Sequence, residues 1–364
     1  MQNSFYDLPV LKKAAKTDDA TVIYLDRPAG AAFEFTAGQY ITLKLDLDGQ
    51  EERRAYSLCT SPDDNEFGFC VKRLDGGKVS NYLLDKLSEG DTLAMMPPEG
   101  RFVAKTDAAQ RKTYFLIGAG SGITPLMSIA RTVLESEPGS AVHLLYGNRS
   151  EATIIFRDEL NDMERRYDGQ FTVSHILSQP ERKKAGGLSG LFGKSKPTWT
   201  GRMGRIDPRE LNLFLADHEA RTPVSEYYIC GPGGMIDTVE KDLLRRGMDD
   251  KHIHTERFLV EEVSDENKIH GSAEGLVRVT LDGAEIEIQV DPDKTILETL
   301  VAAGHNPPYS CTSGACSTCI AKVTEGEVKM DVNHALDPDE VKEGYCLTCQ
   351  SHPVTPSVAL SYDE

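Results

Sequence analysis

The sequence predicts three domains: a small antiparallel β-barrel, a mostly parallel α/β sheet, and a smaller module of strands with one helix and a cysteine-rich loop. At 364 residues the chain is too long for one ordinary core. Short strand-like runs give way near residue 111 to alternating strands and helices, and a polar stretch without periodicity follows the last of them. We therefore expect domains over 1–107, 108–260 and 276–364, with a linker over 261–275.

The first domain is predicted from short β-rich runs separated by turn residues. Only one segment, VSNYLLDKL (79–87), has a helical pattern. Strands at this spacing with so little helix indicate an antiparallel barrel. The expected strands are ATVIYLDRP (20–28), QYITLKLDL (39–47), RRAYSLCTS (53–61), EFGFCVKRL (66–74) and DTLAMMPP (91–98).

The second domain is predicted from strands that each lead into a helix, a pattern typical of a parallel sheet covered by helices. The basic, glycine-rich segment near 183–197 interrupts this pattern, and we expect a surface loop there, with a docking role as the alternative. The expected strands are 113–120, 141–148, 171–177, 226–230 and 254–260, and the expected helices are 123–135, 154–167 and 236–248.

In the third domain, strands are expected over 276–283, 284–290, 320–326, 327–330 and 358–362, with a helix over 295–304. Residues 272–364 hold 16 acidic and 5 basic side chains, a balance of −11 within a net charge of −18. This excess argues against a nucleic-acid partner and favours a module steered toward a basic patch on another protein, although acidity that only aids solubility is an equal alternative.

The cellular compartment is inferred from the lack of long apolar segments in the sequence. Neither an apolar stretch of signal-peptide length at the start nor a run of about 18 apolar residues is present, so we expect a cytoplasmic protein without a membrane partner. Eight cysteines are too few for a disulfide scaffold in a chain of this length. Clustered thiols in a reducing compartment are expected to be metal ligands.

Three cysteines lie close together in YSCTSGACSTCIAKV: Cys311, Cys316 and Cys319. The C-x4-C-x2-C spacing with a distant fourth cysteine is that of plant-type [2Fe-2S] sites. Zinc is the alternative, but its usual C-x2-C pairs, here 316/319 and 346/349, would leave Cys311 unexplained. The small residues between the thiols would let backbone N–H groups approach the cluster sulfurs.

Residues 276–364 resemble a plant-type ferredoxin throughout, which implies a β-grasp fold. In that family the LTCQxxP segment carries the last cluster ligand, and here it contains Cys349. The resemblance therefore implies that Cys349, not Cys346, is the fourth ligand of a [2Fe-2S] cluster.

The stretches RRAYSLCTSP and CVKRLDGGKVSNYL resemble the flavin-binding barrel of the ferredoxin-NADP reductase superfamily. In this resemblance the Arg54 guanidinium pairs with a flavin phosphate, Tyr56 lies against the isoalloxazine, and Ser57 hydrogen-bonds near N5. Backbone donors at Val79 and Ser80 would face the FAD pyrophosphate. The resemblance also makes Val71 and Lys72 FAD-binding candidates.

The segment YFLIGAGSGITPLMS is expected to bind the pyridine nucleotide. It is not a G-x-G-x-x-G fingerprint, but its small residues would let a phosphate reach a helix N-terminus; a plain tight turn is the alternative. Arg149 follows the next strand where no acidic residue stands, which favours NADPH over NADH, although NADH stays possible and Arg149 could simply cap the strand. The candidate residues here are Gly118, Gly120, Gly122, Thr124 and Pro125.

Two later segments resemble those beside the nicotinamide in the same superfamily. YYICGPGGMI contains Cys230, Gly231 and Pro232, and Cys230 is small enough to leave a slot between the rings. HTERFLVEE brings Glu256 or Phe258 toward the flavin. Together with Tyr56 and Ser57, Cys230 and Glu256 are the candidate catalytic residues.

The three modules in this order predict an electron route from NAD(P)H to FAD, to the cluster and then to another protein, because flavin converts two-electron into one-electron transfer. The whole chain is similar to the reductase components of multicomponent oxygenases, a group that includes the reductase subunit of phenylacetyl-CoA epoxidase, which it resembles most. We therefore expect an oxygenase component as acceptor. Alternatives are a hybrid-cluster protein, a steroid hydroxylase, a desaturase, or a redox sensor without turnover.

Overall fold

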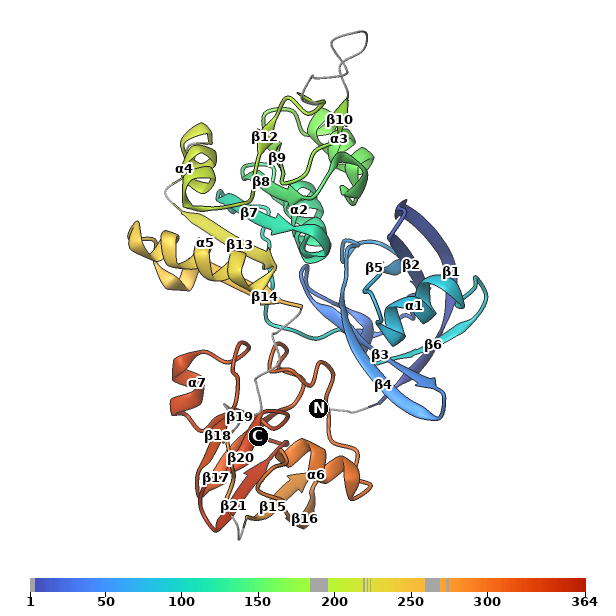
Figure 1. Ribbon diagram of the computed structural model, residues 1–364, viewed down its shortest axis with the longest axis vertical. Coiled ribbons are helices and arrows are strands. Elements are labelled where there is room, and N and C mark those ends of the chain that lie inside the picture. Colours follow the sequence, from blue (N-terminus) through green and yellow to red (C-terminus); the bar gives the residue numbers. More distant parts are fainter. Residues whose placement is uncertain are drawn as a thin grey trace, which may run out of the picture.

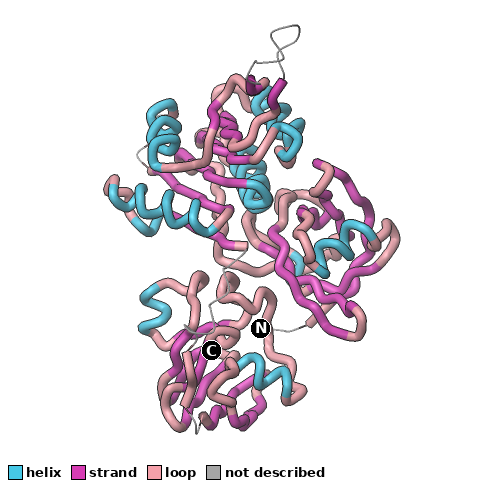
Figure 2. The backbone as a smooth tube through the Cα atoms, in the orientation of Figure 1, coloured by secondary structure: helices cyan, strands magenta, loops and turns pink. Residues whose placement is uncertain are grey.

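The structure, a computed structural model, places three sheet-centred domains as the sequence predicts (Figure 1). Strands dominate the first domain, whereas helices flank the sheet of the second (Figure 2). Within the described residues, no helix is long and apolar enough to cross a membrane. The basic segment near 183–197 falls mostly outside the described residues, as does most of the expected linker. Described are residues 4–183, 196–218, 220, 222, 224–258, 269–272 and 275–364.

The first domain is a six-stranded antiparallel sheet in the order β4-β3-β6-β1-β2-β5. A β-bridge between Leu58 and Phe69 joins its two ends, so the sheet closes into the predicted barrel. Apolar side chains that alternate along the strands fill its interior. The elements are β1 (Tyr6–Thr17), β2 (Ala20–Asp26), the 3-10 helix η1 (Ala31–Phe33), β3 (Tyr40–Leu47), β4 (Gln50–Ser57), β5 (Glu66–Lys72), α1 (Lys78–Asp85) and β6 (Thr92–Met95).

Strand β1 was absent from the sequence prediction. Of its twelve residues only Leu8 and Val10 are buried, so the alternation that marks a half-buried strand is confined to its first half. The lysine-rich second half is held by backbone pairing with β2. The tertiary ladder, not the local pattern, determines this strand.

The second domain is a six-stranded parallel sheet in the order β12-β9-β8-β7-β13-β14. Helices α2 and α3 pack on one face, and α4 and α5 pack on the other. The elements are β7 (Thr113–Ala119), η2 (Gly120–Gly122), α2 (Ile123–Ser136), β8 (Ala141–Asn148), η3 (Glu151–Thr153), α3 (Arg157–Arg166), β9 (Phe171–Leu177), the paired β10 (Arg182–Lys183) and β11 (Lys196–Pro197), β12 (Arg202–Met203), α4 (Pro208–Asp217), β13 (Ser225–Gly231), α5 (Gly233–Arg245), η5 (Asp250–His252) and β14 (Ile253–Arg257).

The sequence prediction also omitted helix α4, although its start carries a clear signal. Asp207 is the N-cap, and its carboxylate accepts a hydrogen bond from the backbone N–H of Glu210 at 2.8 Å. Pro208 occupies the first helical position, where its missing N–H costs nothing. Leu211 and Phe214 then bury the helix against the sheet.

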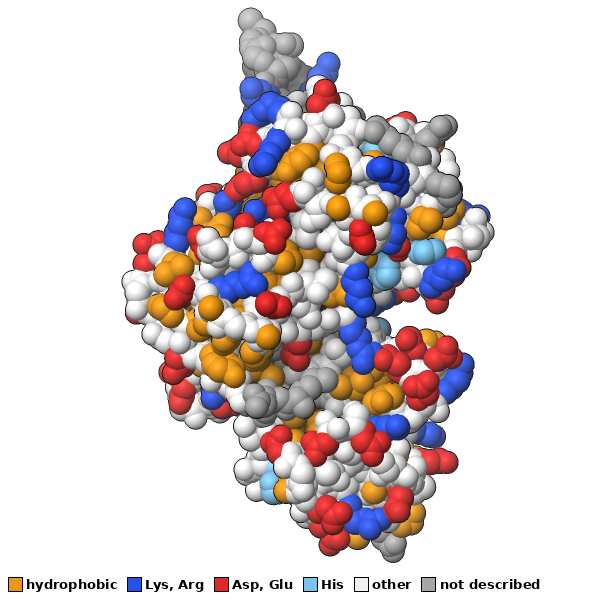
Figure 3. Space-filling view, turned by 180° about the vertical axis from the view of Figure 1, so that it is seen from behind, with side chains coloured by type: hydrophobic (Ala, Val, Ile, Leu, Met, Phe, Trp, Pro, Cys, Tyr) orange, Lys and Arg blue, Asp and Glu red, His pale blue; other side chains and the backbone are white. Residues whose placement is uncertain are grey.

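The third domain has a five-stranded mixed sheet in the order β16-β15-β21-β17-β19 and a separate β18-β20 pair, which confirms the expected β-grasp arrangement. A capping box at Thr295 and Glu298 starts the helix that packs on the sheet. Acidic side chains outnumber basic ones over this lower part of the molecule (Figure 3). The elements are β15 (Leu276–Leu281), β16 (Ala284–Gln289), α6 (Ile296–Ala302), β17 (Ile320–Glu325), β18 (Val328–Met330), α7 (Pro338–Lys342), β19 (Tyr345–Leu347), β20 (Ser351–Pro353) and β21 (Ser357–Ser361).

Candidate functional site

The cysteine loop between α6 and β17 carries three of the predicted ligands, and Cys349 between β19 and β20 is the fourth; together they form two pairs of thiols. A hydrogen bond from the Cys316 thiol lowers the pKa of the Cys311 thiol well below its usual value. On the other side, a hydrogen bond with Cys349 is the main reason why the pKa of Cys319 is raised well above its usual value. Three of the four thiols are at least nine-tenths buried, and Cys311 is partly exposed.

This pairing fits two irons better than one metal ion. Among the described residues, no three His, Cys, Asp or Glu side chains converge closely enough to hold a single ion. A [2Fe-2S] cluster instead needs four thiolates shared between two irons. The backbone N–H groups of Ser313 and Cys316 point at Cys311 Sγ, at 3.5 and 3.3 Å, and would offset thiolate charge there.

The loop conformation depends on Gly314, which has a φ of 73°. A Cβ at this position would stand 2.9 Å from the carbonyl oxygen of Val332, so a larger residue would push the loop off its support. The Gln350 amide completes the loop by donating to the carbonyl of Thr312 at 3.0 Å, and it lies 3.7 Å from Cys349 Sγ.

Cys346 occupies a different environment from the paired thiols. It lies within β19, opposite Ala321 of β17. Burial raises its pKa to about 11, and a hydrogen bond with Ser351 opposes this rise. The thiol that neighbours Cys319 is Cys349, not Cys346.

Ser57, at the end of β4, meets Glu256 of the second domain. Its hydroxyl donates to Glu256 Oε2 at 2.9 Å across the junction of the two domains. Burial raises the pKa of Glu256 to about 8, so this carboxyl is mostly protonated at neutral pH. Beside Ser57, the Tyr56 ring packs at 5.2 Å and 42° on Phe69 of the barrel core.

The other predicted flavin residues have partners within the chain or are buried. The Arg54 guanidinium lies 3.0 Å from Glu52 and is half-exposed, so it can be redirected toward a ligand. Lys72 Nζ lies 3.6 Å from Asp19. In α1, Ser80 accepts a hydrogen bond from Leu74 N at 3.2 Å. The side chains of Val71 and Val79 are buried in the barrel, so only the backbone of these two residues could contact a ligand.

The predicted nucleotide residues meet at the carboxyl edge of the parallel sheet. Cys230 of β13 pairs with Gly118 on one side and with Glu256 on the other. Gly122 lies so close to β13 that a Cβ there would stand 2.1 Å from the carbonyl oxygen of Cys230. Gly120 has a φ of 56°, and a Cβ on it would come within 4.0 Å of Lys72 Nζ, so barrel and loop meet here.

The turn between β7 and α2 is formed by the 3-10 turn η2. Thr124 donates to the carbonyl of Ser121 at 2.8 Å, and Pro125 is buried in the first turn of α2. In the neighbouring segment, Gly231 packs against Ala119 and Pro232 is the N-cap of α5.

Two more predicted residues lie at the margins of this edge. Arg149 follows β8 with an exposed side chain, while its carbonyl accepts from Gln179 N at 2.7 Å. Phe258 directly follows β14 and packs, partly buried, against the core shared by α2 and the barrel.

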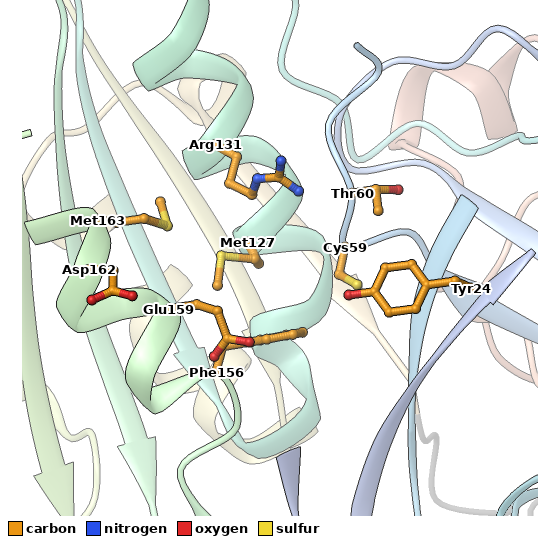
Figure 4. Close-up of a pocket in the computed structure, with 9 residues that line it drawn as sticks. All are labelled: Tyr24, Cys59, Thr60, Met127, Arg131, Phe156, Glu159, Asp162 and Met163. Carbon is orange, nitrogen blue, oxygen red and sulfur yellow. The ribbon is translucent and has the colours of Figure 1, made fainter. Parts of the chain in front are cut away.

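A cavity of about 230 Å³ opens where the barrel meets α2 and α3 (Figure 4). None of the predicted site residues lines it. Glu159 on its wall pairs with Lys16, and Arg131 pairs with Asp64 at 2.7 Å. These ion pairs tie the barrel to the second domain.

Sequence reasoning missed the contacts between the cysteine loop and the barrel. Thr318 donates to Glu99 Oε1 at 2.6 Å, and its oxygen lies 2.8 Å from the Tyr40 hydroxyl. The buried Arg53 guanidinium lies 4.0 Å from the centre of the Tyr309 ring. These partners are more than 200 residues apart in the chain, and no short-range pattern could have indicated them.

Comparison with known proteins finds a match in each of the three domains. Three family models match: an oxidoreductase FAD-binding domain over residues 7–103, an oxidoreductase NAD-binding domain over 116–241, and a 2Fe-2S iron-sulfur cluster binding domain over 279–354.

Similar proteins match over nearly the whole chain. One component of the 1,2-phenylacetyl-CoA epoxidase of Escherichia coli (strain K12) is 36% identical, over 99% of this chain and 98% of that protein. The ferredoxin reductase component of 3-ketosteroid-9-alpha-monooxygenase from Rhodococcus rhodochrous is 33% identical, over 91% and 88%. The structure of phthalate dioxygenase reductase superposes with a TM-score of 0.59 and 26% identity, over 99% of this chain and 98% of that one.

Proposed function

The chain belongs to the family of ferredoxin-reductase-type oxidoreductases that join FAD-binding, NAD-binding and [2Fe-2S] domains, and we propose that it carries electrons from NADPH to an oxygenase component. One observation supports this most directly. Strand β4 meets the nucleotide edge through Ser57 and Glu256, and its neighbour β3 contacts the cysteine loop through Tyr40 and Thr318. A flavin beside β4 would therefore stand between the hydride donor and the cluster.

The residues that would hold each group follow from their placement. We propose Cys311, Cys316, Cys319 and Cys349 as ligands of the [2Fe-2S] cluster, because they form two pairs of neighbouring thiols. Backbone N–H groups of the loop would stabilise the charge on the thiolates. A bound FAD supplies the conversion of a two-electron hydride into two single electrons.

For FAD, we propose that Arg54, Lys72 and the start of α1 carrying Val79 and Ser80 hold the phosphates, while Tyr56 lies against the ring system. The backbone of Val71, next to Lys72 in β5, would face the same group. Glu256, held protonated by burial, lies beside Ser57 and would make its own acid proton available to the flavin. A carboxylic acid that stays neutral near pH 7 can serve as a donor, which an ionised one cannot.

For the nucleotide, we propose that the glycines at 118, 120 and 122, with Thr124 and Pro125, receive the phosphates at the N-terminus of α2. The nicotinamide would lie near Cys230, Gly231 and Pro232, with Phe258 close by. NADPH is favoured because Arg149 is exposed at the end of β8, where a 2′-phosphate would need a cation.

The acceptor that we propose is an oxygenase component similar to that of the phenylacetyl-CoA epoxidase system, because the relative with 36% identity belongs to such a system. We also propose a cytoplasmic location, since four clustered thiols need a reducing compartment to stay available to iron. Domain limits at 1–107, 108–260 and 276–364, with a linker over 261–275, complete the proposal.

The test is reduction of cytochrome c by the purified, cofactor-loaded protein with NADPH or NADH. We expect rapid turnover with NADPH and slower turnover with NADH. A protein that binds FAD and cluster but does not turn over with either nucleotide would be a redox sensor instead. Turnover that favours NADH would overturn the nucleotide assignment only.

A further inference from the structure

The third domain docks on the barrel through the turn that separates two candidate cluster ligands. Thr318 stands between Cys316 and Cys319, is 1% exposed, and places its hydroxyl 3.5 Å from Cys316 Sγ. A threonine hydroxyl carries one proton. Because Thr318 donates that proton to Glu99, it accepts from Tyr40, and the three groups form a directed chain from Tyr40 through Thr318 to Glu99.

Tyr40 and Glu99 form a rigid platform for this contact. Their backbones exchange two hydrogen bonds of 2.9 Å each, which fixes the two side chains beside one another. Gly100 lets the Tyr40 ring lie close to the backbone, since a Cβ there would stand 2.9 Å from the ring. In the β3-β4 ladder Tyr40 lies opposite Ser57. A single residue therefore separates the cysteine loop from the candidate flavin site.

A second contact fixes the start of the same loop. Arg53, next to Arg54 in β4, is 4% exposed, and its Nη2 donates to Asn306 Oδ1 at 2.6 Å. Its guanidinium lies over the Tyr309 ring, two residues before Cys311. The loop is therefore held on the barrel both before its first ligand and before its third.

We propose that Tyr40 and Glu99 are positioning residues that hold the cysteine loop in the arrangement that transfers electrons within the chain. This inference rests on the proposed function. With FAD and the cluster bound, each hydride from NADPH would supply two electrons, which would leave one at a time by way of the cluster to the acceptor, while the proton of the hydride would return to solvent. Neither residue exchanges electrons; both act through Thr318.

The test compares the wild type with the Tyr40→Phe/Glu99→Ala double variant, which removes the two partners that the barrel offers to the Thr318 hydroxyl. After mixing with NADPH without oxygen, rapid absorbance measurements follow the flavin and the cluster separately. Hydrogen bonds to charged groups shift an equilibrium by about tenfold or more, so we expect cluster reduction to slow about tenfold while flavin reduction stays unchanged. Iron content and the cluster potential should also stay as in the wild type.

A readout independent of turnover is hydrogen-deuterium exchange in peptides that span residues 309–320, which we expect to become faster in the double variant. The matched control is Tyr114→Phe. It removes a different buried tyrosine hydroxyl, one that donates to the carboxylate of Glu137 within the second domain. This control should leave the cluster reduction rate and the exchange of the loop unchanged.

Unchanged cluster reduction in the double variant overturns the proposal, whether or not the exchange rate moves. An equal slowing in Tyr114→Phe overturns it as well, because the effect would then be general. If the wild type reduces its flavin but never its cluster, the proposed function itself fails. That outcome is distinct from a failure of the positioning role.

Discussion

Replacing Gly122 with alanine perturbs the closest approach in the candidate nucleotide site. The new Cβ would stand 2.1 Å from the carbonyl oxygen of Cys230, 2.5 Å from its carbonyl carbon and 2.9 Å from Gly231 N. All three are backbone atoms, so no side chain can rotate away. The φ of Gly122 is −61°, which alanine adopts freely, so the effect comes from space alone and not from backbone strain.

The magnitude follows from these distances. Cβ contacts shorter than about 3 Å are essentially absent from proteins, so the η2 turn and β13 must separate by roughly 1 Å. Overpacking of this kind costs about 1–3 kcal/mol of stability. A displacement of roughly 1 Å between groups that position reactants can slow a reaction by about 100-fold. We therefore expect Gly122→Ala to slow flavin reduction by NADPH by about two orders of magnitude.

The assay is flavin reduction by NADPH in the absence of oxygen, measured together with thermal unfolding. Gly234→Ala is the control for stability, because a Cβ there meets nothing within 4 Å and its place in α5 favours alanine. It should unfold at the wild-type temperature or slightly above. If Gly122→Ala reduces its flavin at the wild-type rate, the nucleotide does not use this turn, and the placement of the site at this edge is wrong.

Three further predictions concern the ligands, the nucleotide and a buried carboxyl. Cys349→Ser should lose the cluster absorbance while flavin reduction by NADPH continues, and Cys346→Ser should keep the cluster; the reverse pattern in iron analysis would reassign the fourth ligand. Arg149→Ala should raise the KM for NADPH at least about tenfold, the loss expected for one charge-assisted phosphate contact, and leave the KM for NADH nearly unchanged; equal changes would remove the case for a 2′-phosphate. Burial raises the pKa of Glu256 from 4.5 to about 8, so the folded protein holds a proton that the unfolded chain releases, and stability should fall as pH rises from about 5 to 8. Denaturation of Glu256→Gln should lack this part of the pH dependence, and parallel curves for both proteins would contradict the raised pKa.

The sequence predicted those parts of the fold that local patterns determine. The parallel strands read as apolar runs because helices cover both faces of their sheet, and β13 is buried over most of its length. The cysteine spacing likewise predicted a loop that carries three thiols, which the structure places beside Cys349. The sequence did not predict strand β1, because its second half is held by pairing with β2 and not by burial of its own side chains.

The sequence predicted which segments form the candidate site, but not which of their residues contact one another. The stretches around Ser57 and Glu256 were singled out separately, yet their hydrogen bond depends on how two domains pack. Adjacent arginines show the same limit. Arg54 was expected to matter and is half-exposed, whereas Arg53 is buried against the third domain. Because successive side chains of a strand point to opposite faces of the sheet, Arg53 and Arg54 lie on different faces. The alternation does not indicate which face another domain will cover.

The most direct test of the account is a reductive titration of the cofactor-loaded protein with NADPH, without oxygen and with flavin and cluster spectra recorded together. If one chain holds both groups in electronic contact, full reduction should take about 1.5 equivalents of NADPH per chain, two electrons for the flavin and one for the cluster. Flavin bleaching complete at about one equivalent, with the cluster still oxidised after excess NADPH, would contradict the account.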